Sequence, residues 1–248
     1  MTFISIEPHD GWYESTIEDF CDNICPHLGL DISYRDVEFS GFWSQGDGAS
    51  FTGCFKLSDV CLDDLKASVP TEVDLHEIVG GLQAFVEEHP NIEGRISRLS
   101  SRYSHSNTMI MGDYSSENSY CDEETEAFAA ADGEATLMRI FRELADWLYS
   151  QLNTAYDFYR ADATAWAWAN AIEERTALQD DLSQLQADVV TNPPQSLIQS
   201  NALTVAIAAL EDEIETLSSK IDQLSDQFHY WPKEDGPIGI EEFYEKYL

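Results

Sequence analysis

The residues best suited to metal chemistry gather in the segment Cys21-x3-Cys25-x-His27. Thiolate and imidazole groups are preferred zinc ligands, and a structural zinc ion takes four ligands in tetrahedral geometry. Only three candidates cluster here, and a four-residue spacing places Cys21 and Cys25 one turn apart on the same face of a helix. Cys54 and Cys61 are the only candidates to complete such a site. The segment is therefore interpreted as a helix with two core thiols, and no metal or other cofactor is expected.

A second group that could hold a cation is the acidic run Asp122, Glu123, Glu124 and Glu126. The run lacks the alternating oxygen ligands and the central glycine of a calcium-binding loop. Acidic side chains at the start of a helix interact favourably with the helix dipole, which explains the run without a bound ion.

Sequence motifs for phosphate binding and nucleophilic catalysis are missing. The segment Gly46-Asp47-Gly48 has no Lys-Ser/Thr after it and is predicted to be a hairpin turn. There is no G-x-S-x-G elbow, and no cysteine lies in a papain-like or caspase-like context. The chain is therefore expected not to be an enzyme. An enzyme of unrecognised type, with a site built from scattered histidines and acids, stays an alternative.

Acidity is the most informative chemical feature of the sequence. Asp and Glu number 47 against 13 Lys and Arg, which gives a formal net charge of −34. Such a chain is not suited to grip nucleic acid directly, because phosphate contacts need cationic side chains. Arg95, Arg98 and Arg102 form only a small basic island. The charge instead favours a basic protein partner, since net charge governs association and solubility rather than fold.

Two stretches without Lys or Arg concentrate the acids, residues 1–34 and 103–138. We expect these stretches to contact the partner. The candidate partner-binding residues are Glu14, Glu18, Asp19 and Asp22 in the first stretch, and Asp113, Glu117, Asp122, Glu123, Glu124 and Glu126 in the second. The alternative, that the acids only keep the protein soluble, is left open.

Residues 1–121 are predicted to form an α+β domain. Helical periodicity indicates helices over residues 12–28, 59–67 and 72–88. One hairpin is expected to pair a strand within 32–43 with a strand within 50–57, and a second hairpin is expected within 93–114. Together they would give a small antiparallel sheet flanked by helices.

Residues 122–231 are predicted to be helical, with a turn near 190–196 at Pro193-Pro194. The return segment carries apolar residues spaced alternately by four and three: Leu203, Ile207, Leu210, Ile214, Leu217, Ile221, Leu224 and Phe228. This heptad seam predicts an antiparallel coiled-coil hairpin with about 165–190, in which Leu182 lies near Leu217. Pairing between two chains is the rival arrangement. Residues 232–248 form a C-terminal tail with a short helix from Glu241.

The segment Val37–Phe51, which contains GFWSQGDGASF, resembles a segment of poorly characterised bacteriophage-encoded proteins, some of which are labelled antitoxin-like. The resemblance implies a viral origin and no particular site residue. No apolar run approaches the roughly 20 residues that span a membrane. The N-terminal residues carry no signal-peptide pattern. The expected location is therefore the cytoplasm of a host cell.

These observations lead to one functional hypothesis with two alternatives. The chain is expected to be a non-enzymatic, DNA-mimic-like phage protein that binds and inhibits a basic host protein of DNA handling or defence. The first alternative is an antitoxin-like or scaffold protein that binds through its coiled coil, which could also form a homodimer. The second is the enzyme of unrecognised type. No membrane or direct nucleic-acid partner is expected.

Overall fold

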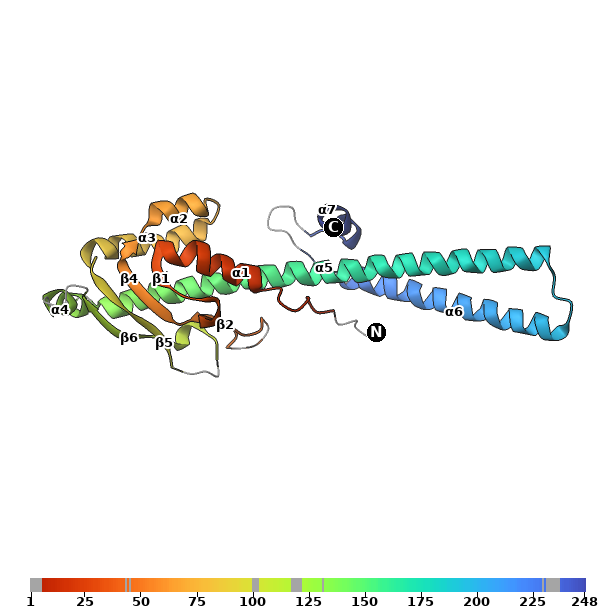
Figure 1. The fold of residues 1–248 in the computed structure, drawn as a ribbon, viewed down its shortest axis with the longest axis horizontal. Coiled ribbons are helices and arrows are strands. Elements are labelled where there is room, and N and C mark those ends of the chain that lie inside the picture. The colour runs from red at the N-terminus through yellow and green to blue at the C-terminus, as the bar shows by residue number, and fades with distance from the viewer. Residues whose placement is uncertain are drawn as a thin grey trace. The chain divides into compact units, whose positions relative to one another are not determined.

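The fold of the chain is α+β, as predicted. A computed structural model describes residues 6–42, 44, 46–99, 103–116, 122–130, 132–228, 230 and 237–248, except the side chains of Asp122 and Glu124. These residues form seven α-helices, a four-stranded antiparallel sheet and a two-stranded antiparallel sheet (Figure 1). The chain divides into two compact units. We call them the sheet unit, residues 11–155, and the arm unit, residues 1–10 and 156–248.

The four-stranded sheet has the strand order β1-β4-β5-β6. Its strands are β1 (Leu28–Asp31), β4 (Gly53–Val60), β5 (Ile92–Arg98) and β6 (Met109–Ser116). The register places Cys54 opposite Arg95 and Lys56 opposite Glu93. The β5–β6 pair confirms the hairpin predicted within residues 93–114.

The first predicted hairpin is only partly correct. β2 (Val37–Phe39) pairs with β3 (Ala49–Phe51) in a separate two-stranded sheet, and the chain from Gly53 onward joins the larger sheet instead. At Gly53 an added Cβ would lie 2.4 Å from the carbonyl oxygen of Asp31. The absent side chain therefore allows β4 to approach β1, which the local sequence pattern does not reveal.

Helices occupy most of the predicted segments. They are α1 (Glu14–Asp19), α2 (Leu62–Ser68), α3 (Val73–Glu88), α4 (Asp122–Ala130) and α5 (Gly133–Thr191). After α1 the helical path continues as a π-helix and a 3-10 helix to His27. The predicted end at residue 28 is one residue too long, because Leu28 already begins β1.

One hydrophobic core unites the sheet with the first part of α5. The inward side chains Phe55 and Ile96 belong to the same buried cluster as Phe141, Leu144 and Leu148. The rings of Phe55 and Phe141 lie 5.5 Å apart. The boundary expected near residue 121 therefore does not coincide with the division into compact units, since the start of the long helical segment is needed to cover the sheet.

The arm unit contains the antiparallel helical hairpin. α6 (Leu197–Gln227) returns alongside α5 after the turn at residues 192–196 (Figure 1). Leu217 packs in a cluster with Ala171 and, at its edge, Leu178. The prediction that residues near Leu182 lie close to Leu217 is only partly correct. Leu178 lies at the edge of the Leu217 cluster, whereas Ala171 is the residue of α5 that is as far from the turn as Leu217 is. None of the helices in the described part of the chain has a stretch that is apolar enough to span a membrane.

The arm unit is completed by α7 (Ile240–Tyr247) and by residues 6–10. Phe243 of α7 is fully buried and packs with Phe158 and Phe228. Tyr156 donates a hydrogen bond of 3.0 Å to Glu7. The short helix predicted from Glu241 is confirmed.

Candidate functional site: an acidic groove on the sheet

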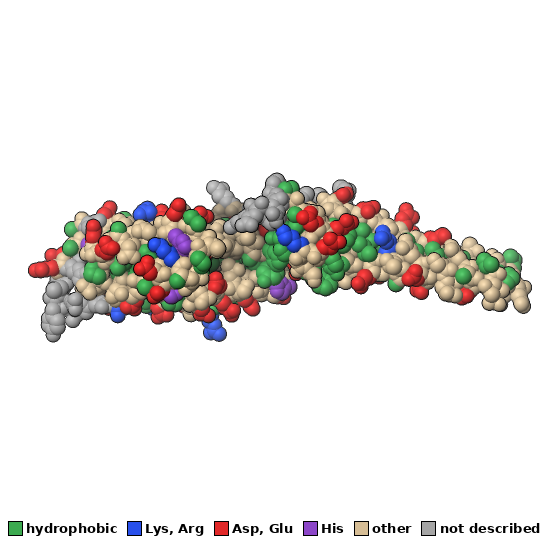
Figure 2. Space-filling model, turned by 90° about the horizontal axis from the view of Figure 1, so that it is seen from above, with side chains coloured by type: hydrophobic (Ala, Val, Ile, Leu, Met, Phe, Trp, Pro, Cys, Tyr) green, Lys and Arg blue, Asp and Glu red, His purple; other side chains and the backbone are tan. Residues whose placement is uncertain are grey.

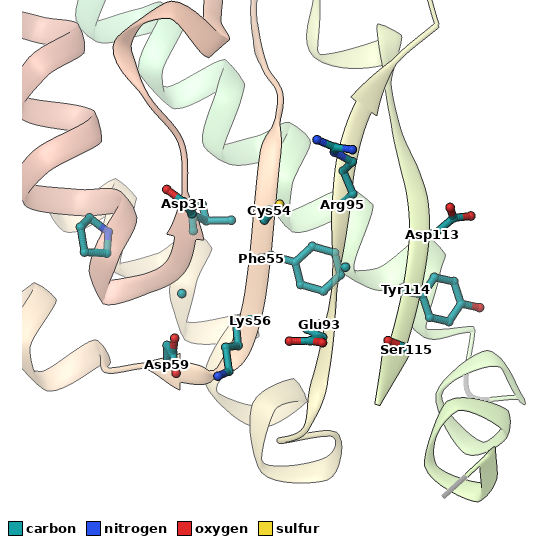
Figure 3. Close-up of a pocket in the computed structure, with 14 residues that line it drawn as sticks. Asp31, Cys54, Phe55, Lys56, Asp59, Glu93, Arg95, Asp113, Tyr114 and Ser115 are labelled. Atoms are coloured by element: carbon teal, nitrogen blue, oxygen red, sulfur yellow. The ribbon is translucent and has the colours of Figure 1, made fainter. Parts of the chain in front are cut away.

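The outer face of the four-stranded sheet is hollowed into a groove of about 870 Å³ (Figure 3). Side chains alternate between the two faces of each strand. On β4, Phe55 and Leu57 are buried, whereas Cys54 is exposed. The groove is therefore lined mainly by the outward-facing set of residues, from all four strands.

Four carboxylates surround the groove, one from each strand: Asp31, Asp59, Glu93 and Asp113. We call this set the acidic groove. All except the half-buried Glu93 are exposed to solvent. Lys56 and Arg95 lie among them, and in Figure 3 the Lys56 side chain extends toward Asp59. The lining is therefore net acidic but includes both signs of charge.

Gly94 lies in the middle of β5, opposite Phe55 of β4 and Tyr114 of β6. A Cβ at this position would lie 2.8 Å from both the Phe55 ring and the Cβ of Tyr114. These distances are too short for any side chain, so glycine here allows the buried Phe55 ring and Tyr114 to pack closely against β5. The exposed thiol of Cys54 lies across the strand pair from Arg95.

The groove adjoins a second hollow of about 540 Å³, which shares Asp31, Cys54 and Arg95 with it. Arg98 lines this hollow but makes a two-pronged ion pair with Glu38. The hydrogen bonds from Arg98 lower the pKa of Glu38, and those to Glu38 raise the pKa of Arg98. Of the small basic island, Arg98 is thus engaged within the fold, and Arg102 lies outside the described residues.

The second acidic stretch lies partly on this site. Asp113 lines the groove, and α4 packs beside β6. The Ser116 amide donates a hydrogen bond of 3.1 Å to the Thr125 hydroxyl, and the rings of Tyr114 and Phe128 lie 4.9 Å apart. α4 therefore flanks the β6 side of the groove.

α4 carries four of the candidate partner-binding residues. Glu123 and Glu126 are exposed. Asp122 and Glu124 belong to the helix, but their side chains lie outside the described part of the structure, as does the whole of Glu117. Two carboxylates of the predicted patch thus stand on the helix that borders the groove.

The candidate residues of the first acidic stretch lie elsewhere on the sheet unit. Glu14, Glu18 and Asp22 are exposed and follow a four-residue spacing, and Asp19 is exposed and accepts a hydrogen bond of 2.7 Å from Asn23. None of them lines the groove. Among the described candidates, the first group therefore does not join Asp113 at the groove.

The segment considered for zinc is part of the core. Cys21 and Cys25 are buried. Burial, together with the charges of Asp22 and Asp36, raises the pKa of Cys21 to about 11, and burial raises that of Cys25. His27 Nε2 lies 3.2 Å from the Ser68 hydroxyl. No group of three or more potential metal ligands was found among the residues that the structure describes.

Two residues of the acidic groove, Asp59 and Glu93, lie outside both acidic stretches, and Asp31 lies in the first stretch but was not among its named candidates. The sequence did contain one signal for Glu93, the alternation of apolar and charged residues along β5. Glu93 and Arg95 fall between Ile92 and Ile96, which are buried. Alternation marks the outward face of one strand, but it does not show which strands are neighbours.

Comparison with known proteins places the sheet unit in a family. No curated protein matches the chain, and no solved structure matches it. Residues 12–162 match DUF8835, a domain of unknown function. The match covers most of the sheet unit and ends early in the arm unit. It extends over more than half of the sequence, and the chain therefore belongs to the DUF8835 family.

Proposed function

We propose that the chain is a non-enzymatic protein that binds a basic protein partner, and that a Lys/Arg-rich segment of the partner occupies the acidic groove. The observation that carries the proposal is the convergence of Asp31, Asp59, Glu93 and Asp113 around one hollow. These carboxylates come from separate strands, and only the folded sheet brings them together.

The groove suits an extended basic segment for two reasons. Exposed carboxylates can pair with cationic side chains without the large desolvation cost of a buried ion pair. Long aliphatic stems of Lys and Arg can lie along apolar surface while their charged ends reach water, and Tyr114 offers such a surface. The net charge of −34 would also steer a cationic partner during encounter.

The mean density of negative charge on the surface is lower than that of DNA, so a DNA-like contact requires acidic residues that cluster in one region. The chain carries about one net negative charge per 430 Å² of its 14712 Å² surface, against roughly one per 110 Å² for a duplex treated as a cylinder. Figure 2 shows acidic side chains scattered over the visible face. We therefore place the DNA-like contact at the acidic groove and α4.

The proposed partner class is a nucleic-acid-binding protein of the host that handles DNA or acts in defence. The resemblance of Val37–Phe51 to bacteriophage proteins supports this choice. An antitoxin-like or scaffold role through the helical hairpin is the alternative. Binding through the acidic groove should weaken steeply as salt rises, whereas binding through an apolar helix face should not.

Direct titration with a basic probe tests the groove. A labelled peptide of about fifteen residues, rich in lysine and arginine, is titrated with the wild type and with the double variant Glu93→Gln/Asp113→Asn. Loss of two pairings at the groove, one with the half-buried Glu93 and one with the exposed Asp113, should weaken binding about three- to tenfold at low salt. Fluorescence anisotropy at two salt concentrations gives the affinity and its salt dependence.

The matched control removes the same two charges from the arm unit. Asp180→Asn/Asp181→Asn changes two exposed carboxylates of α5 and leaves the acidic groove intact. It should weaken binding less than about twofold through the smaller net charge. Equal losses in both double variants would show that only total charge matters, and the groove would no longer be the binding site.

A further inference from the structure

The far end of the helical hairpin has no charge. Residues 189–210 contain no Asp, Glu, Lys, Arg or His, in a chain with a net charge of −34. They include the end of α5, the turn and the first half of α6. We call this segment the arm tip. In Figure 2 the end of the hairpin is covered by hydrophobic and uncharged side chains.

Large apolar side chains of the arm tip face solvent. Val190 is 84% exposed, Leu197 77%, Ile198 82% and Val205 69%. On α6 these residues form a pattern, because Ile198, Ala202, Val205 and Ala209 are spaced by four, three and four and are all exposed. This is heptad spacing, with large and small side chains alternating. We call these four residues the outer stripe.

The outer stripe is distinct from the seam that joins α6 to α5. At about 100° per residue, its members lie about 140° around the helix from Leu203, Ile207 and Leu210. Those seam residues are half-buried. α5 already covers the seam, so the outer stripe is a second heptad face that the described residues of the chain leave uncovered.

We propose that the outer stripe packs against the outer stripe of a second copy of the chain. A basic partner would be bound best by a surface that carries acidic side chains, such as the acidic groove. A like-charged copy instead requires a contact without charge, and the arm tip supplies 22 consecutive residues of that kind. Heptad spacing further indicates that the occupant is a helix.

Charge also determines the orientation of the two helices. In an antiparallel pair, Ile198 lies opposite Ala209 and Ala202 lies opposite Val205, so each large side chain meets a small one. Glu211, Asp212 and Glu213 of one copy then lie beyond the start of the other copy's α6. In a parallel pair the same three acids would face their counterparts. The antiparallel arrangement therefore avoids repulsion between like charges.

The contact is short, and the association is expected to be weak. The outer stripe spans about 18 Å of helix, and a contact of this length buries less than the about 800 Å² per partner of a standard interface. We expect a concentration-dependent dimer that is favoured by salt, because screening reduces the repulsion between two highly acidic copies.

Sedimentation velocity of the full chain at low and high salt tests this proposal. The wild type should shift toward a dimer as concentration and salt rise. The double variant Ile198→Glu/Val205→Glu should weaken the association about tenfold or more, since each change places a charge in the contact. The matched control Val73→Glu/Leu99→Glu alters two other exposed apolar residues, 62% and 72% exposed, and should dimerise like the wild type. Helical circular dichroism confirms that each variant is folded.

A mixing experiment tests the orientation. Ala202→Lys and Val205→Glu should each weaken self-association, and an equimolar mixture of the two should restore it through a Lys–Glu pair across the antiparallel contact. A wild type that stays monomeric at high salt would overturn the proposal. So would an Ile198→Glu/Val205→Glu variant that dimerises as strongly as the wild type. Binding of monomeric wild type to phosphatidylcholine vesicles would instead assign the arm tip to a membrane surface. All these outcomes are independent of peptide binding in the acidic groove.

Discussion

Glu38 and Arg98 connect the small β2–β3 hairpin to the four-stranded sheet. Glu38 lies on β2, within the segment that resembles phage proteins, and Arg98 ends β5. The Arg98 side chain is only 15% exposed, while that of Glu38 is 44% exposed. Since a partly buried guanidinium needs its hydrogen-bond partner, this pair should contribute more to stability than an ordinary surface ion pair.

Glu38→Gln should lower stability at neutral pH but not in acid. Arg98 lowers the pKa of Glu38, so the pair stabilises the fold above the ordinary glutamate pKa of about 4.3. That contribution is lost as the pH falls through the lowered pKa of the folded state. After allowance for solvent screening, the expected loss at pH 7 is about 0.5–1 kcal/mol. Chemical denaturation of wild type and variant at pH 7 and at lower pH measures the difference.

Glu143→Gln is the matched control for this prediction. Glu143 pairs with Arg139 on α5 and is 42% exposed, close to the value for Glu38, but its arginine is 59% exposed. Its removal should change stability little at either pH. If both variants lose the same stability at pH 7, burial of Arg98 has no energetic consequence.

At the scale of elements, Gly29 determines how β1 joins the sheet. The register between β1 and β4 shifts between Leu28 and Leu30, which marks a bulge at Gly29. Gly29 has a φ of +62°, and an added Cβ would lie 2.1 Å from the carbonyl oxygen of Lys56. Both the backbone conformation and the space therefore require glycine here.

Gly29→Ala should destabilise the sheet unit by at least about 2 kcal/mol, since it combines a left-handed conformation with a backbone clash. Gly80→Ala on α3 should instead increase the stability of the sheet unit. An added Cβ there meets nothing within 4 Å, and alanine favours a helix over glycine by about 0.5–1 kcal/mol. Thermal denaturation of both variants compares the two effects. A Gly29→Ala protein as stable as the wild type would contradict the role assigned to the bulge.

Elements with local patterns could be predicted from the sequence, and those set by distant contacts could not. The heptad seam predicted α6, and the Pro193-Pro194 pair predicted its turn, because both signals lie within the element. β1 is only four residues long and directly follows a helical stretch, so local periodicity does not separate it. The acidic groove depends on the order of four strands. Of its four carboxylates, only Asp113 was a named candidate, and Asp31 was covered only as part of the first acidic stretch.

At the scale of the whole molecule, the acidity predicts that the protein does not bind duplex DNA. A gel shift at roughly 150 mM salt should show no complex, because repulsion between like charges opposes contact with phosphates. The basic peptide used for the acidic groove is the positive control on the same sample. Tight binding to the duplex would exclude a DNA-like role for the carboxylates.

The two compact units differ in whether their residues are continuous in the sequence, and therefore in when they can fold during synthesis. The sheet unit is one continuous stretch, residues 11–155, whereas the arm unit combines residues 1–10 with 156–248. At 5–20 residues per second, a ribosome needs about 5–20 s to add residues 156–248. The sheet unit can therefore fold first. Glu7 can contact Tyr156, and His9 can contact Tyr159, only after those tyrosines of the arm unit have been synthesised. The arm unit thus closes only after translation has passed the sheet unit, so its folding depends on residues that are far apart in the sequence.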